Sequence, residues 1–491
     1  MAQVVNVDTD GLIKAAATVA EHLQGAATPP TGAVPAAAAP SPADVAAAQA
    51  AGAIRTRIAA VSTELAVKGP KLRGVTTGAA GTLQAQDAEN ADRIAAVRAR
   101  RGIQAAGRHF KQGGGPGDDV PPNDPREFSK WWQSLSPAEK DRVYSNDHDI
   151  GNHPGMPWDP SDPADPNNFH LGKDHYNRLH LPELEQQTQA DVDRMQRSLD
   201  DLMAGRNADD GAIYALQSQL AAVKNHLQGY KAVDAQLNST DGPRRYLGQL
   251  DEFGRGAIAL NNPDTATHNA ILVPGTGQDL TTIGGADGKA LRLYNAALQA
   301  DRSLGPQDVA VTTWMGYDRP MSLDHADFPD PARAGAADLD AFEAGQRASH
   351  VGDPSIDTVI GHSYGSTVLG AAASGGHQLD ANNVIAVGSP GLLVDHAGDL
   401  SLAPGGHVYA MRAQNDIIGL AGGTTQWTLG PEPDKPGFGA IDLQADPGPA
   451  WPFGLPSTDA HSSYWGLGNR ALLNMGSIIA GKPPPFVIGQ Q

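Results

Sequence analysis

The stretch Asp357-Thr-Val-Ile-Gly-His-Ser-Tyr-Gly365 constrains this chain more than any other. Apolar and β-branched residues lead directly into Gly-x-Ser-x-Gly, and the small residues Ser-Thr-Val-Leu-Gly-Ala-Ala-Ala follow without a break. This pattern predicts a strand, a sharp turn with a serine at its tip, and a helix. Glycine at the first and last motif positions allows the strand and helix to approach closely, because a Cβ atom would collide there. We therefore predict that Ser363 is a nucleophile exposed at the end of a strand.

A nucleophilic serine needs a base and an acid that orients the base, and with this turn they follow in the order Ser, Asp or Glu, His. The strand-like run 407–412 leads into Asp416, which is the predicted acid. His461 lies in a polar loop before the final helical run and is the predicted base. Asp395 and Asp399 remain alternatives for the acid, because they follow the preceding strand-like run.

Other histidines compete for the role of the base. His396 and His407 come before the predicted acid, which is the wrong order. His362 neighbours the serine, but consecutive residues point apart, so we expect its ring to pack beside the turn. The alternative for His461 is that it is a surface-loop histidine without a catalytic role.

An acyl-transfer site also needs two backbone N–H groups aimed at the developing negative charge. The Tyr364 amide, directly after the nucleophile, is one predicted donor. The other is the amide of Thr276, in the glycine-rich turn that follows the strand-like run 268–273. A phosphate-binding loop is the alternative for this turn, but Leu280 stands where a dinucleotide fingerprint has its third glycine. The later run 284–290 lacks the first glycine of a P-loop and the Ser or Thr after its lysine.

These segments together resemble the actinobacterial α/β-hydrolase family formerly catalogued as a domain of unknown function, which is related in outline to cutinases and serine esterases. The resemblance covers about residues 244 to 485, with a weaker echo upstream. It implies a serine hydrolase fold with this Ser-Asp-His triad and no particular substrate. The Asp- and Pro-rich insert around 158–168 departs from the family pattern. The resemblance rests on Ile271-Leu-Val-Pro-Gly-Thr-Gly277, Val309-Ala-Val-Thr-Thr-Trp-Met-Gly-Tyr-Asp-Arg-Pro320, Gly361–Gly365, Val387-Gly-Ser-Pro-Gly391, Gln414-Asn-Asp-Ile-Ile418 and His461-Ser-Ser-Tyr-Trp465.

The alternation of strand and helix patterns predicts the α/β class, with a mostly parallel sheet and helices on both of its faces. An α-helical N-terminal domain is expected to precede this α/β-hydrolase sheet. Strands are predicted near 255–260, 268–273, 308–313, 356–361, 383–388 and 407–412. The predicted division is a helical hairpin domain with an Ala/Pro linker over 1–111, an irregular Gly/Pro/Asp-rich segment over 112–180, a helical pair and lid over 181–243, and the catalytic domain over 244–491.

The small-residue helices predicted over 1–111 resemble helical-pair domains linked to type VII secretion in actinobacteria. Their Trp-x-Gly signature is absent from a helical turn, because Trp314-Met-Gly316 follows a strand-like run. The resemblance implies a type VII secretion partner. A spacer, or a hairpin through which the chain associates with itself, is the alternative.

Composition limits the partners and the chemistry. A net charge of −19 argues against nucleic acid or an anionic membrane surface as a partner, since both require basic patches. The chain has no cysteine, which excludes disulfides and thiolate chemistry. No apolar run approaches a transmembrane length, and the start lacks a signal-peptide pattern. We therefore expect a soluble protein that is cytoplasmic or exported without a cleaved signal peptide. No cofactor or metal is predicted, because the Asp- and His-rich segment 120–180 has no known ligand spacing.

The predicted activity is hydrolysis of an acyl bond through an acyl-serine intermediate. A small-molecule or lipid ester, as in esterases and lipases, is favoured over a peptide only by analogy with the resemblance. A non-catalytic or secretion-associated binding protein that keeps the fold is the alternative. Trp314 and Tyr317 follow a predicted strand and are expected to form an apolar wall of the substrate pocket. The alternative for Trp314 is that it caps the core.

Overall fold

A computed structural model describes residues 121–159, 171–205, 210–322, 326–425, 428–451 and 454–489. These residues all belong to the second of two units of the chain, Phe110–Gln491. The predicted N-terminal helical domain and its Ala/Pro linker, 1–111, lie outside the described residues. The secretion and self-association hypotheses attached to them therefore stay predictions.

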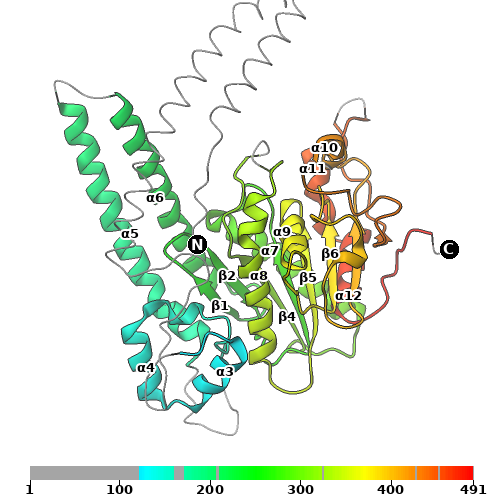
Figure 1. Cartoon of the computed structure of the whole chain (residues 1–491), viewed down its shortest axis with the longest axis horizontal. Coiled ribbons are helices and arrows are strands. Elements are labelled where there is room, and N and C mark those ends of the chain that lie inside the picture. The colour runs from blue at the N-terminus through cyan, green and yellow to red at the C-terminus, as the bar shows by residue number, and fades with distance from the viewer. Residues whose placement is uncertain are drawn as a thin grey trace, which may run out of the picture. The chain divides into compact units, whose positions relative to one another are not determined.

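An eight-stranded sheet with the order β1-β2-β4-β3-β5-β6-β7-β8 forms the centre of the fold (Figure 1). Strand β2 pairs antiparallel with both β1 and β4, and every other pair of neighbouring strands is parallel. The mostly parallel sheet is thus confirmed. The strands are β1 (Arg245–Leu250), β2 (Gly256–Leu260), β3 (His268–Val273), β4 (Val309–Met315), β5 (Ile356–His362), β6 (Asn383–Val387), β7 (His407–Met411) and β8 (Ile441–Leu443).

The six predicted strands are all present, but the two edge strands, β1 and β8, were not predicted. We expected the sheet to begin near residue 255, whereas β1 precedes that point and forms one edge. Strand β8 is only 3 residues long and forms the other edge. Neither strand has the continuous apolar run by which the inner parallel strands are recognised.

Helices cover both faces of the sheet, as predicted (Figure 1). Because side chains alternate along a strand, Val359 packs into the core with α8 and α9, and Ile360 packs into the opposite core with α7 and α12. The α/β class is therefore confirmed. The helices that follow the central strands are α7 (Ile283–Ala300), α8 (Asp330–Ser349), α9 (Tyr364–Ala372) and α12 (Arg470–Ile479), and the shorter α10 (Ile418–Thr425) and α11 (Thr458–His461) follow β7 and β8.

Two long helices, α5 (Lys173–Ala204) and α6 (Asp210–Leu237), precede the sheet and pack against each other. Apolar side chains at helical spacing predict such a pair, although α5 begins earlier than the predicted start at 181. Near the sheet, Tyr230 and Val233 of α6 pack with Leu247 of β1. Farther out the two helices bury a separate cluster: Val192, Leu199, Leu220 and Leu227.

The prediction of an irregular segment over 112–180 is wrong for its described part. Residues 121–159 contain α3 (Pro125–Ser134), α4 (Pro137–Asn146) and the short helix η1 (His148–Asn152). Their Pro, Asp and Ser residues start helices rather than break them. Asp124 accepts from the backbone amides at the start of α3, and Ser136 forms a capping box with Glu139 at the start of α4.

The histidines of this segment have structural partners. His148 Nδ1 lies 2.6 Å from a Glu183 carboxylate oxygen, and the His153 ring stacks on Phe128 at 3.5 Å. Among the described residues, no three His, Asp or Glu side chains gather as candidate metal ligands. In the same part of the chain, no helix is both long enough and apolar enough to cross a membrane.

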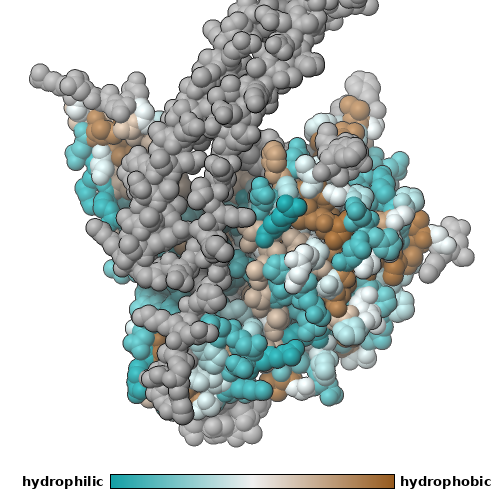
Figure 2. All heavy atoms as spheres, viewed as in Figure 1, coloured by the Kyte–Doolittle hydropathy of each residue, from teal (hydrophilic) through white to brown (hydrophobic). Residues whose placement is uncertain are grey.

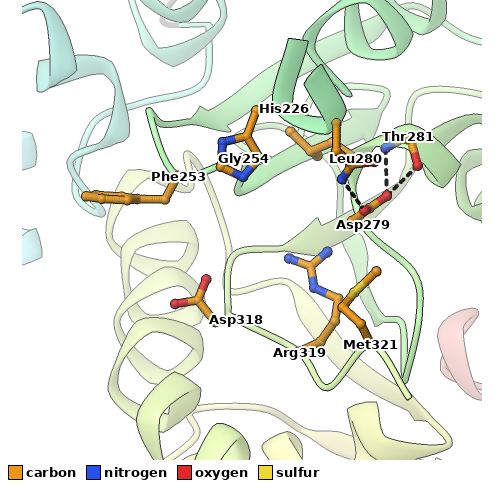
Figure 3. A pocket seen from close by; sticks show the side chains of 10 residues that line it. His226, Phe253, Gly254, Asp279, Leu280, Thr281, Asp318, Arg319 and Met321 are labelled. Carbon is orange, nitrogen blue, oxygen red and sulfur yellow. Dashed lines mark hydrogen bonds between the residues drawn. The ribbon is translucent and has the colours of Figure 1, made fainter. Parts of the chain in front are cut away.

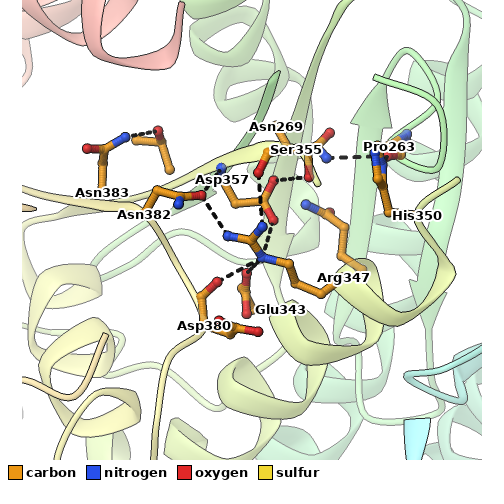
Figure 4. A network of polar contacts seen from close by, with 12 residues as sticks. Pro263, Asn269, Glu343, Arg347, His350, Ser355, Asp357, Asp380, Asn382 and Asn383 are labelled. Atoms are coloured by element: carbon orange, nitrogen blue, oxygen red, sulfur yellow. Dashed lines mark hydrogen bonds and ion pairs between the residues drawn. The ribbon is translucent and has the colours of Figure 1, made fainter. Parts of the chain in front are cut away.

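A buried polar network joins α8 to the amino ends of the central strands (Figure 4). The Arg347 guanidinium lies 2.7 Å from a carboxylate oxygen of Asp357 at the start of β5 and donates to Asn382 Oδ1 at 2.7 Å. Arg347 also lies 3.4 Å from Glu343 one turn earlier in α8. Burial and the neighbouring Asp357 carboxylate raise the pKa of the fully buried Glu343 to about 8. Glu343 is therefore largely protonated at neutral pH.

This raised pKa predicts a pH-dependent contribution to stability. Below pH 4.5, the ordinary value for a glutamate, Glu343 is protonated in both the folded and unfolded states. As the pH rises from there to about 8, only the unfolded state releases the proton, so the free energy of unfolding decreases. We expect Glu343→Gln to remove this contribution, so that the variant gains stability over wild type between pH 5 and pH 8.

Urea unfolding at several pH values measures the difference between the two proteins. Exposed Glu127 provides a matched control, and Glu127→Gln should follow the wild-type pH dependence. A constant difference between Glu343→Gln and wild type over this range would contradict the protonated state of Glu343.

Candidate active site

Ser363 occupies the sharp turn between β5 and α9, as the motif predicts, but the residue is 8% exposed and is therefore buried rather than exposed. Its backbone has φ 55° and ψ −131°, a strained conformation for a residue with a side chain. The turn brings the strand and helix so close that a Cβ atom at Gly361 would overlap the backbone of Ser366. Because the structure holds this strain at one serine in a tightly packed turn, the position has the form of a nucleophile elbow.

The structure pairs His461 with Asp416. The imidazole Nδ1 lies 2.8 Å from Oδ1 and 2.9 Å from Oδ2 of the carboxylate. Since a carboxylate accepts, Nδ1 carries the proton, and Nε2 is left as the acceptor. The Asp416 side chain is fully buried, whereas that of His461 keeps an exposed fraction of 17%. This arrangement suits an acid that orients a base which still has access to solvent.

Two further donors hold the Asp416 carboxylate in place. The Ile418 amide donates to Oδ1 at 2.8 Å, and the Tyr464 hydroxyl donates to Oδ2. The Tyr464 oxygen in turn accepts from the Ala413 amide at 3.1 Å, which ties the acid to the end of β7. Tyr464 was not predicted as a site residue. The one sequence signal for such a role is its position three residues after the predicted base.

The alternative acids and bases lie elsewhere. Asp395 and Asp399 are exposed, and Asp399 accepts from the His396 amide at 3.0 Å to start a short helix. His407 is exposed and lies beside the Tyr409 ring. None of these side chains has a hydrogen bond to His461 within the described part of the chain.

Ser363 and the Asp416–His461 pair meet at the end of β6. The Ser363 amide donates to the Val387 carbonyl at 2.9 Å. A Cβ atom built on the next residue, Gly388, would lie 2.8 Å from Asp416 Oδ2 and 3.2 Å from His461 Cε1. The Ser363 backbone and the side chains of Asp416 and His461 therefore all lie at the end of β6. No hydrogen bond joins the Ser363 hydroxyl to the His461 imidazole among the described residues, and such contacts often tighten only when substrate binds.

His362 forms a hydrogen bond to the backbone of His461, the predicted base. Its Nε2 donates to the His461 carbonyl at 2.9 Å, and its ring meets the Trp465 ring edge-on. Burial, with the nearby His461 and Lys289, lowers the pKa of His362 far below its ordinary value, so the ring is neutral. The expectation that His362 packs beside the turn agrees with this position. Lys289 lies over the Trp465 ring, and burial lowers its pKa to about 8.

The turn after β3 lies against the elbow, where an oxyanion hole would be. A Cβ atom at Gly275 would lie 2.7 Å from Ser363 Cβ and 3.0 Å from the Tyr364 amide nitrogen. Only glycine permits this approach. Tyr364 is the first residue of α9, so its amide has no acceptor within the helix. Thr276 directly follows Gly275, and its buried hydroxyl has no hydrogen-bond partner among the described residues. Both predicted donor positions therefore lie next to the nucleophile.

The structure places Trp314 and Tyr317 in the core, which corrects the expectation that they form a wall of the substrate pocket. They are 0% and 1% exposed, and their rings stack at 5.9 Å. Both side chains pack against α8, where Trp314 lies beside Phe342 and Tyr317 lies against Gly335. The alternative reading, that Trp314 caps the core, fits this position. Tyr317 instead donates its hydroxyl to the Pro274 carbonyl at 3.0 Å and so braces the turn after β3.

Comparisons with known proteins agree with this fold. Residues 251–422 match the family model described as alpha/beta hydrolase, and this range includes Ser363 and Asp416. Together with the sheet, this match identifies the fold as that of the α/β-hydrolases. The chain is 32% identical over 413 residues to the uncharacterized protein Rv2079 of Mycobacterium tuberculosis, an alignment that covers 74% of this chain and 56% of that protein. The chain thus spans little more than half the length of that relative.

The chain is also similar to more distant proteins. The uncharacterized protein Mb0988c of Mycobacterium bovis is 29% identical over 233 residues, which cover 46% of this chain and 83% of that protein. Esterase LipW from Mycobacterium marinum has a TM-score of 0.30 at 11% identity, with coverage of 59% of this chain and 96% of that chain. Esterase PE8 has a TM-score of 0.26 at 15% identity, with coverage of 43% and 95%.

The crowding around Gly388 predicts a specific sensitivity to substitution. Gly388→Ala places a methyl group against the carboxylate of Asp416 and the hydroxyl of Tyr464, and it must also adopt a φ of 54°. Gly405→Ala is the matched control, because this glycine also has a positive φ but would have no atom within 4 Å of its Cβ. We expect Gly388→Ala to lose about 1–3 kcal/mol more stability than the control, the usual cost of overpacking.

Urea unfolding of the two variants measures this difference. Equal losses of stability would mean that Asp416, Tyr464 and His461 are not packed around Gly388 as described.

Proposed function

We propose that this protein is a serine hydrolase that cleaves a carboxylic ester through an acyl-serine intermediate. The hydrogen-bonded Asp416–His461 pair, which lies at the strand end that the strained Ser363 also contacts, is the observation that supports this proposal most strongly. A strained serine alone can have a structural cause. A solvent-accessible imidazole with its Nε2 free, held by a buried carboxylate beside that serine, has the form of a general base.

In the proposed reaction, His461 Nε2 takes the proton of Ser363 as Oγ attacks the ester carbonyl carbon. The amides of Tyr364 and Thr276 donate to the resulting oxyanion. Asp416 keeps the imidazole in the required tautomer and stabilises its cation. The imidazolium then gives the proton to the leaving alcohol as the C–O bond breaks.

A water molecule completes the cycle. His461 takes a proton from the water as its oxygen attacks the acyl carbon, and the proton passes to Ser363 Oγ when the acyl-serine bond breaks. The N-terminus of α9 adds to the stabilisation of both oxyanions, since the aligned peptide dipoles place partial positive charge there.

The surroundings of the site support an apolar ester. Leu420 on α10 follows shortly after Asp416 and is 68% exposed, and Leu455 is 55% exposed shortly before His461. On the face drawn in Figure 2, hydrophobic residues gather among hydrophilic ones near α10. Exposed apolar side chains of this kind favour contact with an apolar part of a substrate, and so an esterase or lipase-like substrate.

A non-catalytic binding protein is the second candidate function. One observation favours it: the Ser363 hydroxyl and the His461 imidazole are not hydrogen-bonded to each other in the described structure. Such a protein would keep the fold and bind a ligand near the elbow without forming a covalent intermediate.

Pre-steady-state kinetics distinguish the two functions. With a short p-nitrophenyl ester, the wild type should release a burst of nitrophenol close to one equivalent, followed by slower turnover, because an acyl-serine accumulates. Ser363→Ala should lose the burst and reduce kcat by about 10⁴-fold or more. Ser374→Ala, just beyond the C-terminus of α9, is the control and should behave as wild type.

Ester turnover that is equal in wild type and Ser363→Ala would overturn the proposed nucleophile. Absence of any turnover in the wild type, across esters of graded acyl length, would favour the binding protein.

A further inference from the structure

A pocket of about 210 Å³ lies beside the candidate active site (Figure 3). Four separate segments supply its walls: α6, the turn between β1 and β2, the turn after β3, and the loop after β4. Its lining residues are Asn225, His226, Phe253, Gly254, Asp279, Leu280, Thr281, Asp318, Arg319 and Met321.

The pocket adjoins the turn that carries the proposed oxyanion donor. Asp279 and Leu280 in its wall follow shortly after Gly275, which touches Ser363. On the other side, the Gly277 amide donates to the Pro320 carbonyl at 3.0 Å, and Met321 of the pocket wall is the next residue. The nucleophile and the pocket thus flank one short turn, with the pocket on the side of α6.

Apolar side chains make up much of the wall. Leu280 is buried, whereas Phe253 and Met321 are 54% and 56% exposed. Exposed side chains of this size are free to close over a bound apolar group. The His226 ring faces the pocket in Figure 3. Because burial lowers the pKa of His226, the ring forms an uncharged part of the pocket wall.

The charged groups of the wall already have partners within the protein. The Arg319 guanidinium donates to three backbone carbonyls, at 2.6 Å to Gln278, 2.6 Å to Tyr317 and 3.0 Å to Met315. Asp279 accepts from Asn225 of α6 at 2.7 Å, and Asp318 pairs with an arginine outside the pocket, Arg255. The arginine is therefore not free to bind an anionic ligand, and the two carboxylates would repel one.

We propose that this pocket holds the acyl chain of a neutral ester and excludes acyl chains that end in a carboxylate. The inference rests on the proposed function, because it assigns a place to the acyl part of a substrate whose ester group reacts at Ser363. It also gives α6 a role, since Asn225 and His226 of this helix line the pocket. The limited volume sets an upper size for the chain that binds well.

Filling the pocket tests the proposal. Met321→Trp adds volume at the pocket mouth, and Met203→Trp is the matched control, because Met203 is 57% exposed and lies at the end of α5 outside the lining. The measurement is kcat/KM for p-nitrophenyl acetate, hexanoate and octanoate. We expect Met321→Trp to lower the octanoate-to-acetate ratio at least 10-fold relative to wild type, and Met203→Trp to leave it within 2-fold. Titration of Ser363 with a small fluorophosphonate gives the active fraction of each protein.

A second variant covers the case in which tryptophan disturbs folding. Met321→Ala enlarges the pocket mouth and should shift the preference in the opposite direction, towards longer chains. The exclusion of acyl chains that end in a carboxylate is tested with the p-nitrophenyl monoester of adipic acid, which has the same chain length as the hexanoate ester. The wild-type kcat/KM should be at least 10-fold higher for the hexanoate ester.

The possible results separate the pocket from the nucleophile. If Ser363 is labelled but both Met321 variants keep the wild-type chain-length profile, or Met203→Trp shifts it equally, the pocket does not hold the acyl chain and the proposed function stands. Equal rates for the hexanoate and adipate esters would overturn the charge selectivity. If wild-type Ser363 is not labelled and no ester is hydrolysed, the proposed function fails, and the pocket assignment fails with it.

Discussion

The close approach of three backbone segments around Ser363 is the constraint on which the rest of the site depends. Strand β5 and helix α9 meet at Gly361, and the turn after β3 touches Ser363 through Gly275. Any side chain at these two glycines would push the segments apart. Because the sheet places β3 and β5 next to each other, the proposed oxyanion donors and the nucleophile come together without any long-range adjustment. The strain at Ser363 is sustained by this packing.

The acid and the base reach the same place by a different route. Asp416 lies in the turn after β7, and His461 is the last residue of the short helix α11, which follows β8. A parallel backbone bridge between Asp416 and Ser457 joins these two segments, and side-chain hydrogen bonds add to it. Tyr464 connects Asp416 to the end of β7, and His362 holds the backbone of His461 from the end of β5. The elbow is therefore positioned by backbone packing, whereas the acid–base pair is positioned by a backbone bridge together with side-chain hydrogen bonds.

The sequence predicted the inner parallel strands well, because buried strands of this kind are short apolar runs next to glycine-rich turns. It did not predict β1, whose polar Arg245 and Gln249 interrupt the apolar pattern, nor the very short β8. Asp416 and His461 could be predicted from their order after the serine. The burial of Trp314 could not, because the direction of a side chain after a strand end depends on the helix that packs there. Pro and Asp residues were misread as loop signals where they start helices.

The central claim is that Ser363 is the nucleophile and that His461 activates it. Reaction with a fluorophosphonate, followed by mass spectrometry of the peptides, identifies the modified residue and compares its rate of modification between wild type and His461→Ala. We expect one phosphonate group, located on Ser363, and a rate at least 100-fold lower in the variant. Modification at another residue, or at Ser363 with the same rate in both proteins, would contradict the account.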